Sequence, residues 1–114
     1  MEKPTNIAIF EDHPLMREAI AHNLVLYSSD LLITYKGDSI SNFLASHADR
    51  QSSSVTIAIL DLDLGDGSEP IKNLQRLLDR SISVVVVSAL AKPQVVREML
   101  RNGAAAYVSK NAEP

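Results

Sequence analysis

The chain has 114 residues, of which 46% are hydrophobic and 22% charged, with a formal net charge of -3. This length predicts one domain with one core, and the acidic balance argues against a nucleic-acid surface, which normally carries a basic patch. The absence of cysteine excludes disulfides and thiolate chemistry and fits a cytoplasmic protein, and no apolar run approaches the roughly 18 residues of a membrane span.

The first half of the chain alternates short apolar runs with amphipathic stretches. Segment 6–10 (NIAIF) predicts a strand, and Pro14 opens a helix because its fixed backbone angle suits the first helical position. A second strand is expected over 31–35, a turn over 37–39 and a short helix over 40–47. The first helix has residues recurring at helical spacing: Leu15, Met16, Ala19, Ile20, Asn23, Leu24 and Tyr27.

The second half continues this alternation after a polar loop over 49–54. Segments 55–60 and 105–109 predict strands, and the VVVV run within 81–88 predicts a central strand buried on both faces, because it lacks alternation. One further helix opens at Pro70, and another ends at an Asn102–Gly103 cap. Their apolar positions are Ile71, Leu74, Leu77 and Leu78, then Val95, Val96, Met99 and Leu100.

Alternating strands and helices predict an α/β fold, specifically a flavodoxin-like, doubly wound, five-stranded parallel sheet with strand order 2-1-3-4-5. The chain stops soon after the last predicted strand, although parallel sheets are normally covered by helices on both faces. We therefore expect residues 1–114 to be one domain of a longer protein, cut before or within a fifth helix. An uncovered face also predicts self-association or exchange of elements between copies.

Polar side chains stand at the ends of four predicted strands. Glu11 and Asp12 follow the first, Asp61 ends the third, Ser88 ends the fourth, and Lys110 follows the fifth. Ligands of open α/β sheets bind outside the carboxyl ends of the strands. Neighbouring strands lie about 4.8 Å apart, so the groups on the first and fourth strands would flank the central aspartate. The long lysine would reach it from two strands away.

This cluster predicts a magnesium site used in phosphoryl transfer. Grouped carboxylates repel unless a cation intervenes, and Mg2+ prefers oxygen ligands. We predict that Asp12, Asp61 and the backbone carbonyl of Asp63 bind the ion, with Glu11 acting through a water. A hydroxyl and an ammonium on the other side would suit a phosphoryl group in transfer, with Asp61 as the nucleophile and an acyl phosphate as the product.

Four motifs in this order resemble the receiver domain of bacterial two-component response regulators: IFEDHPLMREAI, AILDLDLGDGS, VVVVSA and RNGAAAYVSK. The EDHP opening and the GAAAYVSK ending look most like receivers joined to a C-terminal LuxR-type DNA-binding domain. The resemblance implies that Asp61 accepts phosphate from a sensor histidine kinase or from small-molecule phosphodonors. Asp12 and Glu11 would then belong to the acidic metal pocket.

The resemblance also implies a conformational switch. Lys110 would hold the phosphoryl group, Ser88 would be the switch hydroxyl and Tyr107 the switch aromatic. Phosphorylation is then a local charge change that biases a two-state element. Asp63 and Leu90 would border the path of the attacking water and tune the lifetime of the phosphate. DNA would be bound by the attached domain, and the receiver would form a homodimer or otherwise self-associate.

Two other functions stay open. The Asp61-Leu62-Asp63 motif also fits a haloacid-dehalogenase-like phosphohydrolase, although such a motif should stand on the first strand, and it leaves Asp12 without a role. A degenerate receiver would act only as an interaction module, which the complete set of polar groups argues against. A calcium loop is excluded because it needs glycine at Asp66 and glutamate at Lys72. His13 is interpreted as a turn or helix-start residue, since an oxygen site does not need it.

Overall fold

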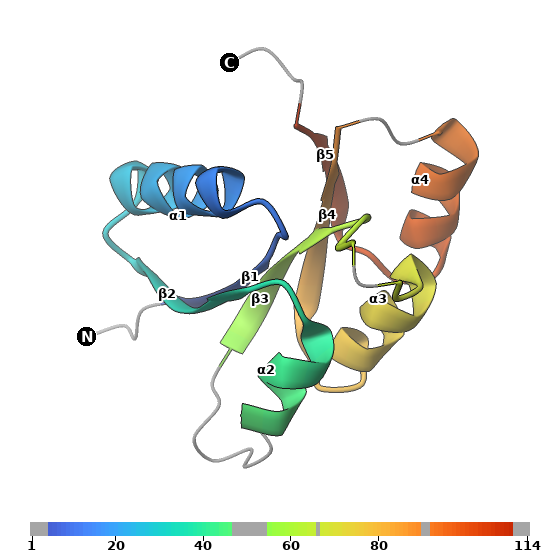
Figure 1. Cartoon of the computed structure of the whole chain (residues 1–114), viewed down its shortest axis with the longest axis horizontal. Coiled ribbons are helices and arrows are strands. Elements are labelled where there is room, and N and C mark those ends of the chain that lie inside the picture. Colours follow the sequence, from blue (N-terminus) through green and yellow to red (C-terminus); the bar gives the residue numbers. More distant parts are fainter. Residues whose placement is uncertain (1–4, 47–54, 66, 90–91, 111–114) are drawn as a thin grey trace.

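Strands and helices alternate along the chain in the computed structural model, which describes residues 5–46, 55–65, 67–89 and 92–110 (Figure 1). His47, loop 49–54, Asp66 and Leu90 lie outside the described residues. The elements agree with the expected ones to within about two residues at each end. Their bounds are β1 (Thr5–Phe10), α1 (Pro14–Tyr27), β2 (Leu31–Gly37), α2 (Ile40–Ser46), β3 (Val55–Asp61), α3 (Pro70–Leu78), β4 (Ser83–Ser88), α4 (Pro93–Arg101) and β5 (Ala106–Ser109).

The strands form one sheet in the order β2-β1-β3-β4-β5, and every neighbouring pair is parallel. This confirms the flavodoxin-like fold and its strand order. Because all strands run the same way, their carboxyl ends meet at one edge. Lys110, which directly follows β5, is the last described residue. None of the described helices is long and apolar enough to cross a membrane.

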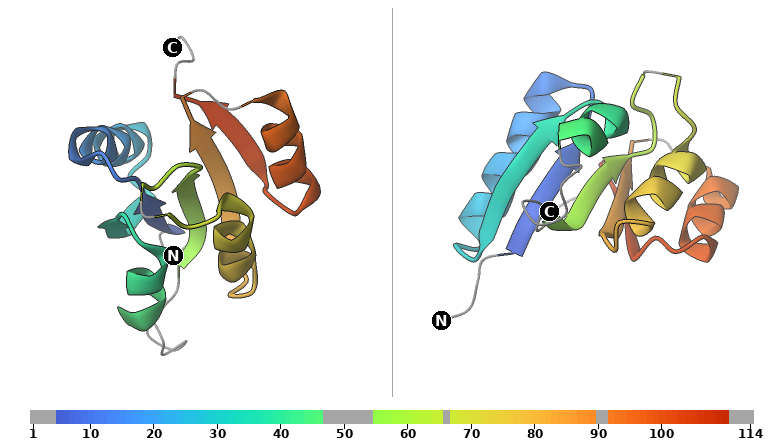
Figure 2. Two further views of the ribbon diagram at one scale, coloured as in Figure 1. Left: turned by 45° about the vertical axis from the view of Figure 1, so that its right-hand side comes forward. Right: turned by 90° about the horizontal axis from the view of Figure 1, so that it is seen from below.

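The sheet separates two layers of helices of unequal size. Helix α1 lies on one face, and α2, α3 and α4 lie on the other, as Figure 2 shows from below. The larger core packs under α2, α3 and α4 and includes contacting rings of Phe10, Tyr35 and Phe43, with centroids 5.1–5.4 Å apart. The smaller core packs Ala21 of α1 on Ile7 and Ile9 of β1. Most of the buried apolar side chains therefore stabilise the face opposite α1.

Helix α1 does not bury the whole stripe expected from its spacing. Ala21 is its buried residue, and Ile20 and Leu24 pack partly against the same core. Leu15 and Tyr27, which also recur at helical spacing, are each 88% exposed. The helix carries apolar residues around most of its circumference, and its spacing alone therefore does not identify the packed face.

Strand β4 is central, as predicted, but its two faces differ in burial. Val84 and Val86 have no exposed surface on the face that carries α2, α3 and α4. On the opposite face Val85 is only partly buried, whereas Val87 is buried. Within the described residues α1 packs mainly on β2 and β1. Burial of both faces is therefore confirmed only in part.

Helices α3 and α4 end with the same backbone motif. At the end of α4 the Ala104 N–H bonds to the Met99 carbonyl, and Gly103 adopts φ 114, which confirms the predicted glycine cap. At the end of α3 the Ile82 N–H bonds to the Leu77 carbonyl, and Ser81 adopts φ 63. A left-handed serine is strained because its Cβ approaches the backbone, so this position stores a small conformational cost.

Candidate functional site

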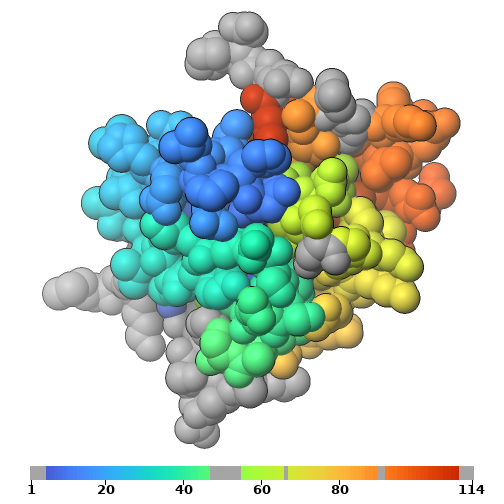
Figure 3. All heavy atoms as spheres, viewed as in Figure 1, coloured from blue at the N-terminus to red at the C-terminus, as the bar shows by residue number. Residues whose placement is uncertain are grey.

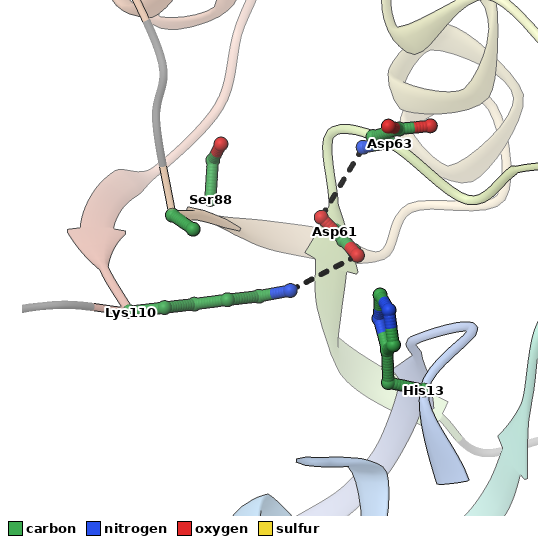
Figure 4. A pocket seen from close by; sticks show the side chains of 6 residues that line it. His13, Asp61, Asp63, Ser88 and Lys110 are labelled. Carbon is green, nitrogen blue, oxygen red and sulfur yellow. Dashed lines mark hydrogen bonds and ion pairs between the residues drawn. The ribbon is translucent and has the colours of Figure 1, made fainter.

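The carboxyl edge of the sheet holds a cleft of about 280 Å3 that contains the expected residues of β3, β4 and β5 (Figure 4). The register explains the grouping, because Asp61 pairs with Val87 and Ser88 pairs with Ser109. The strands therefore end almost level. The cleft is lined by His13, Asp61, Asp63, Ser88, Ala89 and Lys110.

Lys110 joins two buried carboxylates from different strands. Its Nζ lies 3.0 Å from Asp61 Oδ2 and 2.7 Å from Glu11 Oε2. Glu11 has no exposed surface, and Asp61 is almost completely buried. One ammonium thus balances two acids, and the lysine reaches the β3 carboxylate as the sequence predicted.

The pKa values of Asp61 and Lys110 are shifted by burial and by neighbouring charges and hydrogen bonds. Burial raises the pKa of Asp61, and the nearby charge of Glu11 adds to this, while hydrogen bonds from the Asp63 N–H and Lys110 oppose it. Burial alone would lower the pKa of Lys110, but hydrogen bonds and ion pairs with the two carboxylates raise it above its ordinary value. Asp61 is therefore costly to keep charged in the folded protein, whereas the charge of Lys110 is favoured.

The loop after β3 folds back over the acidic turn that follows β1. The Asp63 N–H donates to Asp61 Oδ1 at 3.2 Å, and the Gly65 N–H donates to Asp63 Oδ1 at 3.1 Å. Gly65 has φ 74, and a Cβ placed there would lie 2.8 Å from Asp12 Oδ2. Figure 3 shows the start of α1, in blue, against this yellow-green loop. Glycine is required here both by the backbone angle and by the approach of Asp12.

The acidic turn brings three potential metal ligands together. Glu11, Asp12 and His13 each offer an atom, and these atoms all lie within 4.8 Å of one another. The Asp12 Oδ1 atom is buried, and the His13 Nδ1 atom lies 3.1 Å from it. Arg17 donates from NH1 to the Glu11 carbonyl at 3.0 Å and holds the turn against α1. Grouped carboxylates repel one another unless a cation lies between them, and hard divalent cations prefer oxygen ligands, so the residues present fit a metal.

The expected magnesium ligands fall into two adjacent groups. Glu11 and Asp12 form the acidic turn, while Asp61 and Asp63 line the cleft beside it. His13 belongs to both, since it lines the cleft and its Nδ1 lies 3.2 Å from Glu11 and 3.1 Å from Asp12. It occupies the N-cap position of α1 but makes no side-chain cap hydrogen bond. From the sequence His13 was predicted to be a turn or helix-start residue; its adjacency to two acids was the available signal for a place in the site.

The expected switch residues meet at the end of β4. The Tyr107 hydroxyl donates to the Ser88 carbonyl at 3.4 Å, and the Lys110 backbone N–H donates to the same carbonyl at 3.0 Å. Tyr107 is half-buried and packs against the larger core. In Figure 4 the Ser88 hydroxyl points away from the Asp61 carboxylate. Tyr107 is therefore linked to Ser88 by a hydrogen bond to the Ser88 backbone carbonyl, beside the cleft.

This edge of the sheet identifies the class of protein, which is that of two-component signal receivers. The family described as the response regulator receiver domain matches residues 7–114, and the chain belongs to this family. Family membership, together with the position of Asp61 on β3 rather than on the opening strand, argues against the phosphohydrolase alternative. The domain is a signalling unit of response regulators.

Similar proteins agree with this assignment. The chain is 32% identical over 111 residues to a glycerol metabolism activator of Pseudomonas putida, covering 93% of this chain and 47% of the relative. The chain thus spans about half the length of that curated relative.

Solved structures show the same fold at low identity. The signal receiver domain of the putative response regulator NarL from Mycobacterium tuberculosis matches with a TM-score of 0.78 at 21% identity, covering 98% of this chain and 88% of that one. A LuxR-family DNA-binding response regulator from Staphylococcus aureus matches with a TM-score of 0.79 at 22% identity, covering 96% and 88%. The isolated receiver of RcsB from Salmonella enterica, with a phosphomimetic, matches with a TM-score of 0.82 at 18% identity, covering 98% and 81%.

Proposed function

We propose that Asp61 accepts a phosphoryl group from a sensor histidine kinase or a small-molecule phosphodonor, in a Mg2+-dependent reaction that switches an output domain. The observation that carries this proposal is the 3.0 Å approach of Lys110 Nζ to Asp61 Oδ2 inside the cleft. A buried carboxylate beside a fixed ammonium and an acidic turn is suited to binding and receiving a charged phosphoryl group.

The chemistry is one displacement at phosphorus. A carboxylate oxygen of Asp61 forms a bond to phosphorus, and the bond from phosphorus to the donor's nitrogen or oxygen breaks. Its electron pair leaves with the donor, and the product is an acyl phosphate. The Asp63 N–H, 3.2 Å from Asp61 Oδ1, orients the carboxylate. Lys110 neutralises the charge that the phosphoryl group adds beside Glu11.

The acidic residues would hold the metal in this proposal. Asp12, Asp61 and the backbone carbonyl of Asp63 would be the direct ligands of Mg2+, and Glu11 would act through a water. When bound, the ion neutralises negative charge on the phosphoryl oxygens. The burial of Asp12 Oδ1, which has the His13 ring nitrogen 3.1 Å away, supports this assignment. Gly65 supports it as well, because it lets the β3 loop approach Asp12 closely.

The switch would follow from the new charge on Asp61. The Ser88 hydroxyl would turn toward the phosphoryl oxygens, and Tyr107, which is bonded to the Ser88 carbonyl, would move with it. Asp63, which lines the cleft, would border the water that later hydrolyses the acyl phosphate and would set the phosphate's lifetime.

The whole protein would be a cytoplasmic transcriptional regulator. The Pseudomonas putida relative is named as an activator, and this chain covers only 47% of it. We propose that DNA is bound through a LuxR-type output domain, since the net charge of -3 does not favour DNA binding by the receiver. Apolar side chains that remain exposed on α1, such as Leu15 and Leu26, favour a homodimer or other self-association.

Intact-protein mass measurement tests the phosphoacceptor. The wild type, incubated with acetyl phosphate and Mg2+, should gain the mass of one phosphoryl group and then stop. Asp61→Asn should gain nothing. Asp63→Asn is the matched control, because its proposed ligand is the backbone carbonyl, and it should still be phosphorylated. Phosphorylation of Asp61→Asn, or no uptake by the wild type, would contradict the proposal; the second result would favour an interaction module.

A further inference from the structure

Asn73, on the buried face of α3, is a polar residue in the core of the domain. Its exposed fraction is 2%, and among the described residues the buried polar or charged side chains are those of Glu11, Asp61 and Asn73. The two carboxylates pair with Lys110 at the site. Asn73 is not among the residues that line the cleft, so its burial needs a different explanation.

The helix itself does not need the amide of Asn73. Leu74 and Leu77 share the buried face of α3 and have no exposed surface. The Asn73 backbone N–H already bonds to the Glu69 carbonyl at 3.0 Å in the first turn. Burial of a side-chain amide costs free energy unless the amide is hydrogen-bonded, and leucine favours a helix more than asparagine does. An apolar residue would therefore suit this position better for stability alone.

The side chain of Asn73 binds the loop that follows β3. Its Nδ2 atom donates a hydrogen bond to Ser68 Oγ at 2.9 Å. Ser68 lies three residues after Gly65 in the chain, and Asp63 of the same loop lines the cleft. The hydrogen bond thus connects the core of the domain to the loop that borders the site.

The other anchors of this loop lie before its glycines. Leu62 and Leu64 are buried in the larger core and hold the beginning of the loop. Gly65 and Gly67 then both adopt positive φ, 74 and 80, and glycine leaves the backbone more freedom than any other residue. The hydrogen bond to Ser68 restrains the loop on the far side of these glycines.

This restraint bears on the reacting carboxylate. The Asp63 N–H donates to Asp61 Oδ1 at 3.2 Å, as Figure 4 shows, and the Gly65 N–H donates to Asp63 Oδ1 at 3.1 Å. Both hydrogen bonds depend on the backbone conformation of the loop. A loop that is held at Ser68 therefore keeps the Asp63 N–H in position to orient Asp61.

We propose that Asn73 is a positioning residue of the phosphorylation site, which acts through Ser68 to hold the loop after β3 in the conformation that orients Asp61. The inference deepens the proposed function and rests on it. A side chain that departs from the best choice for the core is expected where function requires it.

Amide hydrogen exchange, measured by NMR without metal or phosphodonor, tests the restraint. Ser68→Ala and Asn73→Leu should each speed exchange of the Asp63 and Gly65 amides about fivefold, the effect of losing one hydrogen bond. Ser68→Thr keeps the hydroxyl and should exchange as the wild type does. The Val86 amide in the central strand should not change, whereas a purely structural role would speed exchange throughout. Unchanged exchange of the loop amides in Ser68→Ala would overturn the proposal.

The double variant tests whether Asn73 acts through Ser68. Once residue 73 is leucine, Ser68→Ala should change the exchange of the Gly65 amide by less than about 1.5-fold. Independent effects, which multiply to about 25-fold in the double variant, would overturn the proposal. Asn102→Leu is the matched control, because it removes a side-chain amide bond of 2.8 Å to the Glu98 carbonyl at the end of α4. It should leave exchange in the loop unchanged.

Phosphate uptake measures the consequence at Asp61. Each single variant, incubated with acetyl phosphate and Mg2+, should take up one phosphoryl group about twofold or more slowly than the wild type, because the carboxylate is less well oriented. An unchanged rate beside faster loop exchange would overturn the positioning role and leave the proposed function standing. A wild type without phosphate uptake, with the predicted exchange, would remove the function and support the hold of Asn73 on the loop.

Discussion

The Nζ atom of Lys110 lies 2.7 Å from Oε2 of Glu11, a carboxylate that has no exposed surface. The same ammonium pairs with Asp61 at 3.0 Å. The Lys110 ammonium, which follows β5, thus balances the charges of two carboxylates: Glu11, directly after β1, and Asp61, at the end of β3. A change in the charge of Asp61 must alter the ion pairs of Lys110 with both carboxylates. Phosphorylation at the end of β3 is thereby linked to the ends of β1 and β5.

Lys110→Ala should separate phosphate uptake from its structural consequence. We expect phosphorylation of Asp61 to persist while the Ser88 and Tyr107 resonances no longer shift in nitrogen-15 NMR spectra. The variant should also lose about 3 kcal/mol of unfolding free energy, because two buried carboxylates lose their partner. Urea unfolding measures this. Lys72→Ala, which removes an exposed ion pair of 3.7 Å, is the control and should cost less than about 0.5 kcal/mol. Normal activation of Lys110→Ala would refute the assigned role.

Asp61→Asn should stabilise the fold at neutral pH. Burial raises the pKa of Asp61, so the folded protein holds a proton that the unfolded chain releases. Stability therefore falls as the pH rises from the ordinary aspartate pKa through the raised folded value. The gain in stability of Asp61→Asn over the wild type should increase over this pH range and persist at higher pH. Thermal unfolding between acidic and neutral pH measures it, with the exposed Asp30→Asn as control; an Asp61→Asn variant less stable than wild type at pH 7 would contradict this account.

Gly65→Ala should damage the acidic turn more than Gly67→Ala does. Both glycines have positive φ, 74 and 80, so both substitutions carry similar backbone strain. A Cβ at Gly65 would lie 2.8 Å from Asp12 Oδ2, whereas a Cβ at Gly67 has nothing within 4 Å. We expect Gly65→Ala to weaken Mg2+ binding several-fold relative to Gly67→Ala, as measured by calorimetry. Equal binding by the two variants would show that the approach to Asp12 has no effect.

Ser81→Gly should stabilise the domain without affecting the site. Ser81 adopts φ 63 at the end of α3, and glycine removes a left-handed cost of about 1 kcal/mol. Gly103→Ala is the opposite change at the matching position of α4: it adds a Cβ to a residue with positive φ. That Cβ would also lie 2.8 Å from Leu78 Cδ1. Urea unfolding should show a gain for the first variant and a loss for the second. A loss for Ser81→Gly would contradict the assigned strain.

The sheet and much of its edge could be predicted because residue types mark where strands leave the core. Apolar runs end in Asp61, Ser88 and Lys110, and parallel strands bring such ends together. The register of the strands then determines which side chains are neighbours at this edge, since Asp61 pairs with Val87 and Ser88 pairs with Ser109. The lysine contact followed from strand order and side-chain length.

Features that depend on tertiary partners were harder to predict. The ion pair of Glu11 was not predicted: this carboxylate is fully buried, and Lys110 supplies its counter-charge. The spacing of apolar residues in α1 does not show which of them pack, since that helix is apolar on several sides and Leu15 is exposed. The C-terminal cap of α3 could not be predicted, because Ser81 occupies a position where glycine is usual.

Borohydride trapping of the phosphorylated protein tests the central claim most directly. Reduction converts an acyl phosphate on aspartate to homoserine, which tandem mass spectrometry locates in a peptide. We expect homoserine at position 61 in protein treated with acetyl phosphate and Mg2+, and none when Mg2+ is chelated. Homoserine at position 12 or 63 instead, or unmodified Asp61 in a protein that has gained phosphate, would contradict it.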